Sequence, residues 1–259
     1  MGYPLDHVYD EAATYAAFLA GTLARAQSVD DIGRLCNDLS GIYRTLGLCE
    51  LLLEADTEQF VLCLVDSALM RRYFLERCKR EGRWDHPECR ASYIAPFCDA
   101  VAVGQRSVAV DIKRSTPPSR FEGYEYESDH AYAWMLMCLA DPEASGDVLE
   151  CMLHDYEVAL GGRPEARLAV CQALVEQNEA AFHPAMLELL AQFEAGVEQA
   201  EARAYRFDDH ERIFVEGLAL LRLADDRGIA TSEHYRYCPA LARRARVSAS
   251  PELRALLAR

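Results

Sequence analysis

The residues best suited to acid–base chemistry form one short run, Asp208-Asp209-His210-Glu211. An imidazole among carboxylates can act as a general acid or base. The same acids also suit the first turn of a helix, where Asp208 or Asp209 would cap backbone N–H groups and His210 would face solvent. Because capping explains the run without any chemistry, we expect no catalytic residues and predict that the protein is not an enzyme.

Cysteine and histidine are frequent enough to raise the question of a metal site. The nearest approach to a ligand cluster is formed by Cys78, His86, Cys89 and Cys98. Their spacing matches no zinc pattern, and the chain contains no C-x-x-C pair and no H-E-x-x-H motif. A Gly-rich phosphate loop and a G-x-S-x-G elbow are also absent from the sequence. We therefore expect neither a metal nor another cofactor.

The densest group of side chains suited to binding is the run FEGYEYESDHAYAW, residues 121–134. Ser128 or Asp129 fits the N-cap of a helix, and the neighbouring acids would then lie at its positive end. Tyrosine is a frequent anchor in interfaces, and carboxylates around it attract a basic partner. In a second interpretation, which stays open, the tyrosines seal a junction between two helical halves. The predicted partner-binding residues are Glu122, Tyr124, Glu125, Tyr126, Glu127, Asp129, Asp208 and Asp209.

The net charge restricts the class of partner. Lys and Arg total 27 against 42 Asp and Glu, which gives a formal charge of −15 over 259 residues. A surface this acidic repels nucleic acid and anionic membranes, so we expect neither as a partner, and it suits a basic protein. Acidity that serves only solubility is the alternative.

The ten cysteines indicate the compartment. Most of them lie within helical patterns rather than in turn-rich loops, as is typical of reduced thiols in a core. The first residues, MGYPLDHVYDE, lack the layout of a signal peptide, and no apolar run is long enough to span a bilayer. We therefore expect a cytoplasmic protein without disulfides.

Apolar residues recur at steps of three and four along nearly the whole chain, as in the stripe Phe182, Met186, Leu189, Phe193 and Val197. The pattern predicts an all-α fold, an array of antiparallel helices like a helical-repeat protein, in a single compact domain over 1–259. A Pro-marked stretch near 104–127 would join an N-terminal to a C-terminal half. Within it, SVAVDI fits a strand or a helix. We expect helices near 6–27, 29–54 (broken near Gly41 or Gly47), 57–81, 88–104, 128–140, 143–159, 164–178, 179–203, 209–227 and 250–258.

Helix-start signals support these boundaries. Ser28 with Asp31 fits a capping box, and Thr57 followed by an acid fits the start of the next helix. Asp141 before Pro142 predicts a further helix start, because proline is favoured at the first helical position.

The C-terminal half resembles a known family. The segment LAVCQALVEQNEAAFHPAMLELLAQFE, residues 168–194, is followed by EGLALLRLADDRGIATSEHYRYCPALAR, residues 216–243. This order is similar to that of the immunity 49 family, whose genes accompany bacterial polymorphic toxins. Two features depart from the family pattern: Cys238 stands where an apolar residue is expected, and residues 231–236 are more polar. The resemblance implies a cytoplasmic protein that neutralises a cognate toxin and carries no catalytic residues.

Three hypotheses follow for the function. In the first, an acidic immunity protein occludes a basic toxin that acts on nucleic acid. In the second, a helical-repeat adaptor or chaperone serves a secretion or regulatory pathway. In the third, an enzyme uses carboxylates and histidine. The sequence identifies neither the toxin nor the oligomeric state, and a toxin gene beside this one would favour the first hypothesis.

Overall fold

The computed structural model describes residues 4–203 and 212–244, and these residues form helices and no strand. The predicted all-α fold is confirmed. The elements are α1 (Leu5–Leu23), α2 (Val29–Leu53), α3 (Thr57–Arg80), the 3₁₀ helix η1 (Pro87–Cys89), α4 (Ala95–Ala102), α5 (Arg106–Ser115), α6 (Glu127–Ala140), α7 (Gly146–Leu160), α8 (Ala166–Val175), α9 (Glu179–Arg203), α10 (Val215–Asp226) and α11 (Ala240–Arg244).

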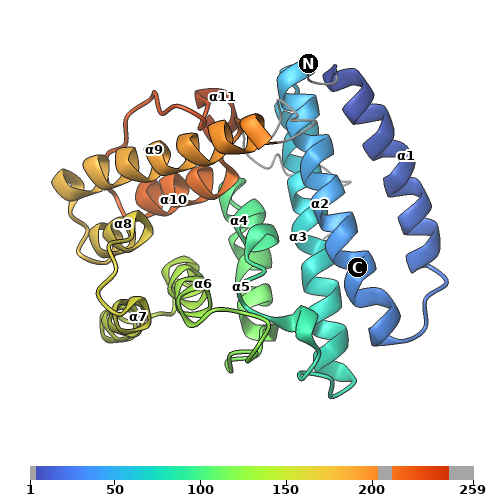
Figure 1. Ribbon diagram of the computed structural model, residues 1–259, viewed down its shortest axis with the longest axis horizontal. Helices are drawn as coiled ribbons and strands as arrows, with labels where there is room; N and C mark the ends of the chain where they lie inside the picture. The colour runs from blue at the N-terminus through green and yellow to red at the C-terminus, as the bar shows by residue number, and fades with distance from the viewer. Residues whose placement is uncertain (1–3, 204–211, 245–259) are drawn as a thin grey trace.

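The first three helices stand side by side as one layer, with α2 between α1 and α3 (Figure 1). Consecutive helices then pack on each other from α3 to α9, as in the predicted array. α10 departs from this order because it turns back and packs against α4. In Figure 1, α9 and α10 lie across the end of the central helices rather than parallel to the first layer.

The main hydrophobic core runs from Val29 in α2 to Ala242 in α11, and a smaller cluster joins α1 to α2. The SVAVDI segment is part of helix α5. One face of that helix, with Val108 and Ile112, packs into the core. The core therefore continues through the region near 104–127, where a junction between two halves stays a prediction.

Two of the predicted helices, 29–54 and 88–104, differ from the structure in their continuity. α2 runs unbroken through Gly41 and Gly47. A Cβ on Gly47 would lie 2.9 Å from Cys63 Cβ and 3.1 Å from the Phe60 carbonyl, so this glycine lets α3 approach closely. The predicted helix 88–104 is instead η1, an irregular stretch and α4, and Arg71 donates to the carbonyls of Glu88 in η1 and Arg90 directly after it, which are therefore not free for helical hydrogen bonds.

The caps differ in detail from the prediction. The Ser28 side chain accepts from the Asp31 N–H and its hydroxyl donates to the Asp31 carboxylate, so Ser28 is confirmed as the N-cap of α2. Asp56, rather than Thr57, caps α3. α6 begins one residue before Ser128, with Tyr126 at its N-cap.

The start of α7 was predicted wrongly. Asp141 accepts from the Glu143 N–H within a turn and pairs with Lys113 at 2.7 Å. The helix therefore begins only after Ser145, whose side chain accepts from the Val148 N–H. The predicted helix 250–258 and the first residues of the predicted helix 209–227 lie outside the described part of the chain. No described helix is long and apolar enough to cross a membrane.

Candidate partner-binding surface

The tyrosine loop, residues 116–126, joins α5 to α6 and presents two rings to solvent. Tyr124 is 63% exposed and Tyr126 is 78% exposed. A turn brings them outward: the Tyr124 N–H donates to the Phe121 carbonyl, and Gly123 takes the left-handed conformation with φ +80°. The interpretation in which these tyrosines seal a junction is therefore wrong.

Glu125, between the two tyrosines, points the opposite way. Its side chain lies in the interior, where one carboxylate oxygen accepts from the Phe121 N–H and the other from the Ser92 N–H, each at 3.0 Å. Glu125 was predicted to contact a partner, and its burial corrects that expectation. The turn at residues 121–124 carries the rings outward, whereas the Glu125 carboxylate folds back to the Phe121 N–H at the start of the same turn.

The backbone to which Glu125 binds is itself fixed to the first layer of helices. Arg71 of α3 is buried and donates to the carbonyls of Glu88 and Arg90, just before Ser92. Its guanidinium lies 5.2 Å from the centre of the Tyr93 ring, and burial lowers the pKa of Arg71 to about 10. The tyrosine loop is thus held through residues 86–94 onto α3. The sequence contained a signal for this contact, because Arg71 interrupts the apolar stripe of its helix.

Exposed carboxylates surround the two rings. Glu122 lies in the loop, with its side chain 89% exposed and 3.8 Å from Arg120. Glu127 and Asp129 follow in the first turn of α6 and are both exposed. Burial lowers the pKa of His130, which favours its neutral form and leaves the charge of this surface negative. We call these residues the acidic tyrosine surface: Glu122, Tyr124, Tyr126, Glu127 and Asp129.

The run Asp208-Asp209-His210-Glu211 lies outside the described residues. The partner-binding roles of Asp208 and Asp209 therefore stay predictions, as does the absence of an acid–base site at His210. Among the described residues, no group of three His, Cys, Asp or Glu side chains is placed to hold a metal ion.

A buried carboxylate in the core could suggest chemistry, but its partners give it a structural role. Asp99 of α4 is fully buried and accepts from Arg44 Nε at 2.8 Å and from the Ser67 hydroxyl. Burial raises the pKa of Asp99, and the Arg44 charge acts in the opposite direction. Because Arg44, Ser67 and Asp99 come from three helices, the group joins α2, α3 and α4.

A hollow of about 450 Å³ opens beside this group, between α2, α4 and the start of α10. Its acidic side chain, Glu216, is also held from inside. Glu216 accepts two hydrogen bonds from Arg167, at 2.7 and 2.8 Å, and one from the Tyr132 hydroxyl at 2.7 Å. This clamp joins α6, α8 and α10 and was not predicted from the sequence, since its three members are far apart along the chain.

Comparison with known proteins identifies the family. The family described as Immunity protein 49 matches residues 76–242, which is more than half of the chain. The chain belongs to the immunity protein 49 family. The resemblance read from residues 168–194 and 216–243 is confirmed, and with it an immunity role in general. Neither a curated protein nor a solved structure matches the chain.

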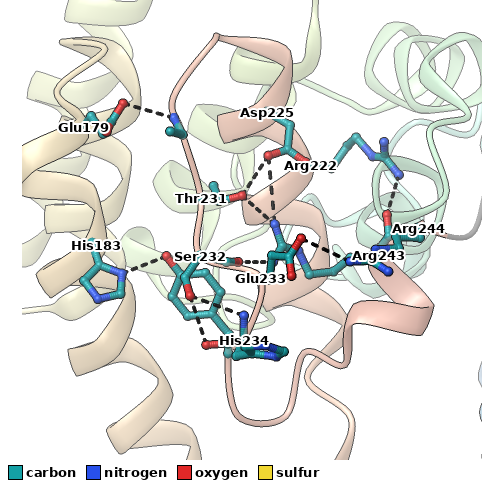
Figure 2. A network of polar contacts seen from close by, with 12 residues as sticks. Glu179, His183, Arg222, Asp225, Thr231, Ser232, Glu233, His234, Arg243 and Arg244 are labelled. Atoms are coloured by element: carbon teal, nitrogen blue, oxygen red, sulfur yellow. Dashed lines mark hydrogen bonds and ion pairs between the residues drawn. The ribbon is translucent and has the colours of Figure 1, made fainter.

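The range that matches the immunity protein 49 family includes the whole tyrosine loop and excludes α1 and α2. Near its C-terminal end, the polar residues that departed from the family pattern form a network (Figure 2). Thr231 donates to Asp225 at 2.9 Å, and Arg243 donates to Thr231 and to the Ser232 carbonyl. These hydrogen bonds hold residues 231–236 against the end of α10.

Two further contacts complete this end of the immunity protein fold. The Tyr235 hydroxyl lies 2.9 Å from His183 Nδ1 of α9. Cys238 is fully buried, and a Cβ on Gly217 would lie only 2.8 Å from its sulfur. Cys238 therefore fills the position of the expected apolar residue, because a thiol packs as a small hydrophobic group.

Proposed function

We propose that this immunity protein acts in the cytoplasm by binding a cognate toxin through the acidic tyrosine surface. The proposed toxin is basic and acts on nucleic acid, and its inhibition is by occlusion without catalysis. The supporting observation is that Tyr124 and Tyr126 are both largely exposed on a braced loop among carboxylates. Family membership supports the immunity role, and the charge of −15 supports a basic partner.

The rings of Tyr124 and Tyr126 suit the role of anchors. A tyrosine ring carries a large contact area on few rotatable bonds, so little side-chain entropy is lost when a partner covers it. The Glu125 contacts hold the backbone between the rings before any partner arrives. Preorganisation of this kind lowers the entropic cost of binding and slows dissociation.

The surrounding carboxylates suit a different task. Glu122, Glu127 and Asp129 are exposed, so each is worth little as an individual ion pair in water. Together they create a field that accelerates the encounter with a basic surface and weakens with salt. An enzyme that binds the phosphates of nucleic acid presents such a basic surface, and carboxylates on its cleft would exclude the substrate.

The test is binding of the protein encoded by the neighbouring toxin gene, by surface plasmon resonance at low and high salt. We expect Tyr124→Ala to raise the dissociation rate and to cost about 2 kcal/mol or more of affinity. The matched control is Val158→Ala in α7, which removes a side chain of similar exposure (62%) and should leave binding unchanged.

The charge arm reverses Glu122, Glu127 and Asp129 together to Lys. We expect a slower association rate and a weaker salt dependence, with a smaller change in the dissociation rate. The control reverses three exposed acids elsewhere, Glu150, Glu157 and Glu188, which gives the same net charge. The proposal would be refuted if the two charge reversals changed the association rate equally and the Tyr124→Ala variant bound the toxin as tightly as the wild type does. An adaptor or chaperone would instead bind proteins other than the neighbouring gene product.

A further inference from the structure

The hollow between α2, α4 and the start of α10 combines an apolar wall with one cationic group. Its volume of about 450 Å³ lies within the range of small-molecule sites, which are typically apolar cavities with a few polar groups that orient the ligand. The apolar part of the wall comprises Leu48, Ile94, Ala95, Phe193, Phe214 and Val215.

Arg44 of α2 supplies the cationic group. Its Nε donates to the fully buried Asp99 at 2.8 Å, yet the Arg44 side chain is 26% exposed and lines the hollow. A guanidinium has five N–H donors, so four remain on Nη1 and Nη2. No described residue accepts a hydrogen bond from these two nitrogens. The end of the guanidinium therefore offers a pair of donors, a geometry that matches the two oxygens of one carboxylate.

Two helix N-termini adjoin the same hollow. α4 and α10 pack against each other, and the hollow is lined by Ile94 and Ala95 at the start of α4 and by Phe214 and Val215 at the start of α10 (Figure 1). No described side chain caps either helix, and α4 has no acid in its first turn. The positive end of a helix dipole favours an anion, so these helix ends act in the same direction as Arg44.

The other ionisable groups of the wall leave room for a single negative charge. Glu216 is neutralised by Arg167, which donates to both of its carboxylate oxygens. Burial raises the pKa of the Cys98 thiol, so it stays uncharged. Because Asp99 already balances part of the Arg44 charge, the hollow suits a monoanion better than a dianion such as phosphate.

We propose that this hollow binds a monocarboxylate that carries an apolar group. The carboxylate lies on Nη1 and Nη2 of Arg44, and the apolar group lies against Leu48, Phe193 and Phe214. A free organic acid and the last residue of a protein chain that ends in an apolar side chain both offer this chemistry. None of the lining residues belongs to the acidic tyrosine surface, so this site is independent of the proposed toxin interface.

The test is a titration of the isotopically labelled full chain, followed by nuclear magnetic resonance of its backbone amides. Hexanoate represents a free acid, and N-acetyl-leucine represents the end of a protein chain. We expect the better of the two to bind with a Kd of about 1 mM or less and to shift the amides of Ala95 and Val215. Which acid binds more tightly identifies the source of the ligand. Hexanamide and N-acetyl-leucinamide lack the negative charge and should bind at least about tenfold more weakly than the matching acids.

A substitution at Gly41 narrows the hollow without disturbing the fold. Gly41 lines the hollow, and a Cβ built on it meets no atom within 4 Å. Gly41→Leu should therefore weaken binding at least about tenfold while preserving the helical circular dichroism. The matched control is Gly21→Leu in α1, a position that is equally open but does not line the hollow, and it should bind as the wild type does.

A second pair of variants tests the guanidinium. Arg44→Lys keeps the positive charge but loses the paired donors, so binding should weaken at least about fivefold. Arg34→Lys makes the same exchange on α2 in a side chain that is 89% exposed, and it should have no effect. Failure of both acids to bind at about 10 mM, equal binding of the neutral amides, or unchanged binding in Gly41→Leu or in folded Arg44→Lys would overturn the proposal.

Discussion

Glu125→Ala is the substitution that most directly tests how the tyrosine loop is held. The wild-type carboxylate accepts from the N–H groups of Ser92 and Phe121 and is 8% exposed. A hydrogen bond to a charged group contributes about 1.5–3 kcal/mol, so the two bonds together contribute about 3–6 kcal/mol to the order of the loop. Because the loop can open without unfolding the core, we expect the free energy of global unfolding to fall by only about 2 kcal/mol.

Amide hydrogen exchange measures the local part of this effect. In the wild type, the Ser92 and Phe121 amides are protected by Glu125. In Glu125→Ala we expect both to exchange at least about tenfold faster, which corresponds to about 1.4 kcal/mol or more of lost local stability. Toxin affinity should fall by a similar factor, although Glu125 itself touches no partner, because the rings must then be ordered on binding.

Glu122→Ala is the matched control for this experiment. It removes the same side chain three residues earlier, where the carboxylate is 89% exposed. It should leave the exchange of both amides and the unfolding free energy unchanged. Wild-type exchange rates at Ser92 and Phe121 in Glu125→Ala would refute the conclusion that this buried acid holds the loop.

The remaining predictions concern stability and thiol chemistry. Glu216→Ala should lower the free energy of unfolding, measured in urea, by about 3 kcal/mol, because it leaves Arg167 and the buried Tyr132 hydroxyl without their acceptor. As a control, Glu143→Ala, which removes an exposed carboxylate, should lower the same free energy by about 0.5 kcal/mol or less. Iodoacetamide should modify Cys151 first in the native protein, because this cysteine is exposed. After denaturation without reductant, mass spectrometry should find all ten cysteines modified, and two unmodified cysteines would reveal a disulfide. Burial raises the pKa of Asp66 to about 6, so the folded protein keeps a proton that the unfolded chain releases, and stability falls as pH rises from about 4 to 6. Asp66→Asn should therefore be about 1–2 kcal/mol more stable than wild type at about pH 7 and equal to it near pH 3, and equal stability at both pH values would contradict this.

The sequence alone determined the fold class and most of the helices. The stripe around Phe182 and Met186 has the period of a helix, and that period depends only on local backbone geometry. The N-cap at Ser28 is local in the same way. The family was also readable from residues 168–194 and 216–243, because the order of its helices is preserved along the chain. The run 121–134 predicted a binding surface whose role stays a prediction, and no local pattern indicated that Glu125 faces inward, because its direction depends on the Ser92 N–H of a distant segment.

Tertiary structure alone decided which polar groups face inward and which helices meet. Arg71 interrupts an apolar stripe, but only the carbonyls of Glu88 and Arg90 explain why a charge lies there. The helix that periodicity predicted from residue 88 begins only at Ala95, after those carbonyls. The clamp of Glu216 with Arg167 and Tyr132 exists because α10 returns to the centre of the fold, a contact between segments far apart in the chain. Local sequence specifies backbone conformation, whereas the partner of a buried charge depends on where distant helices come to lie.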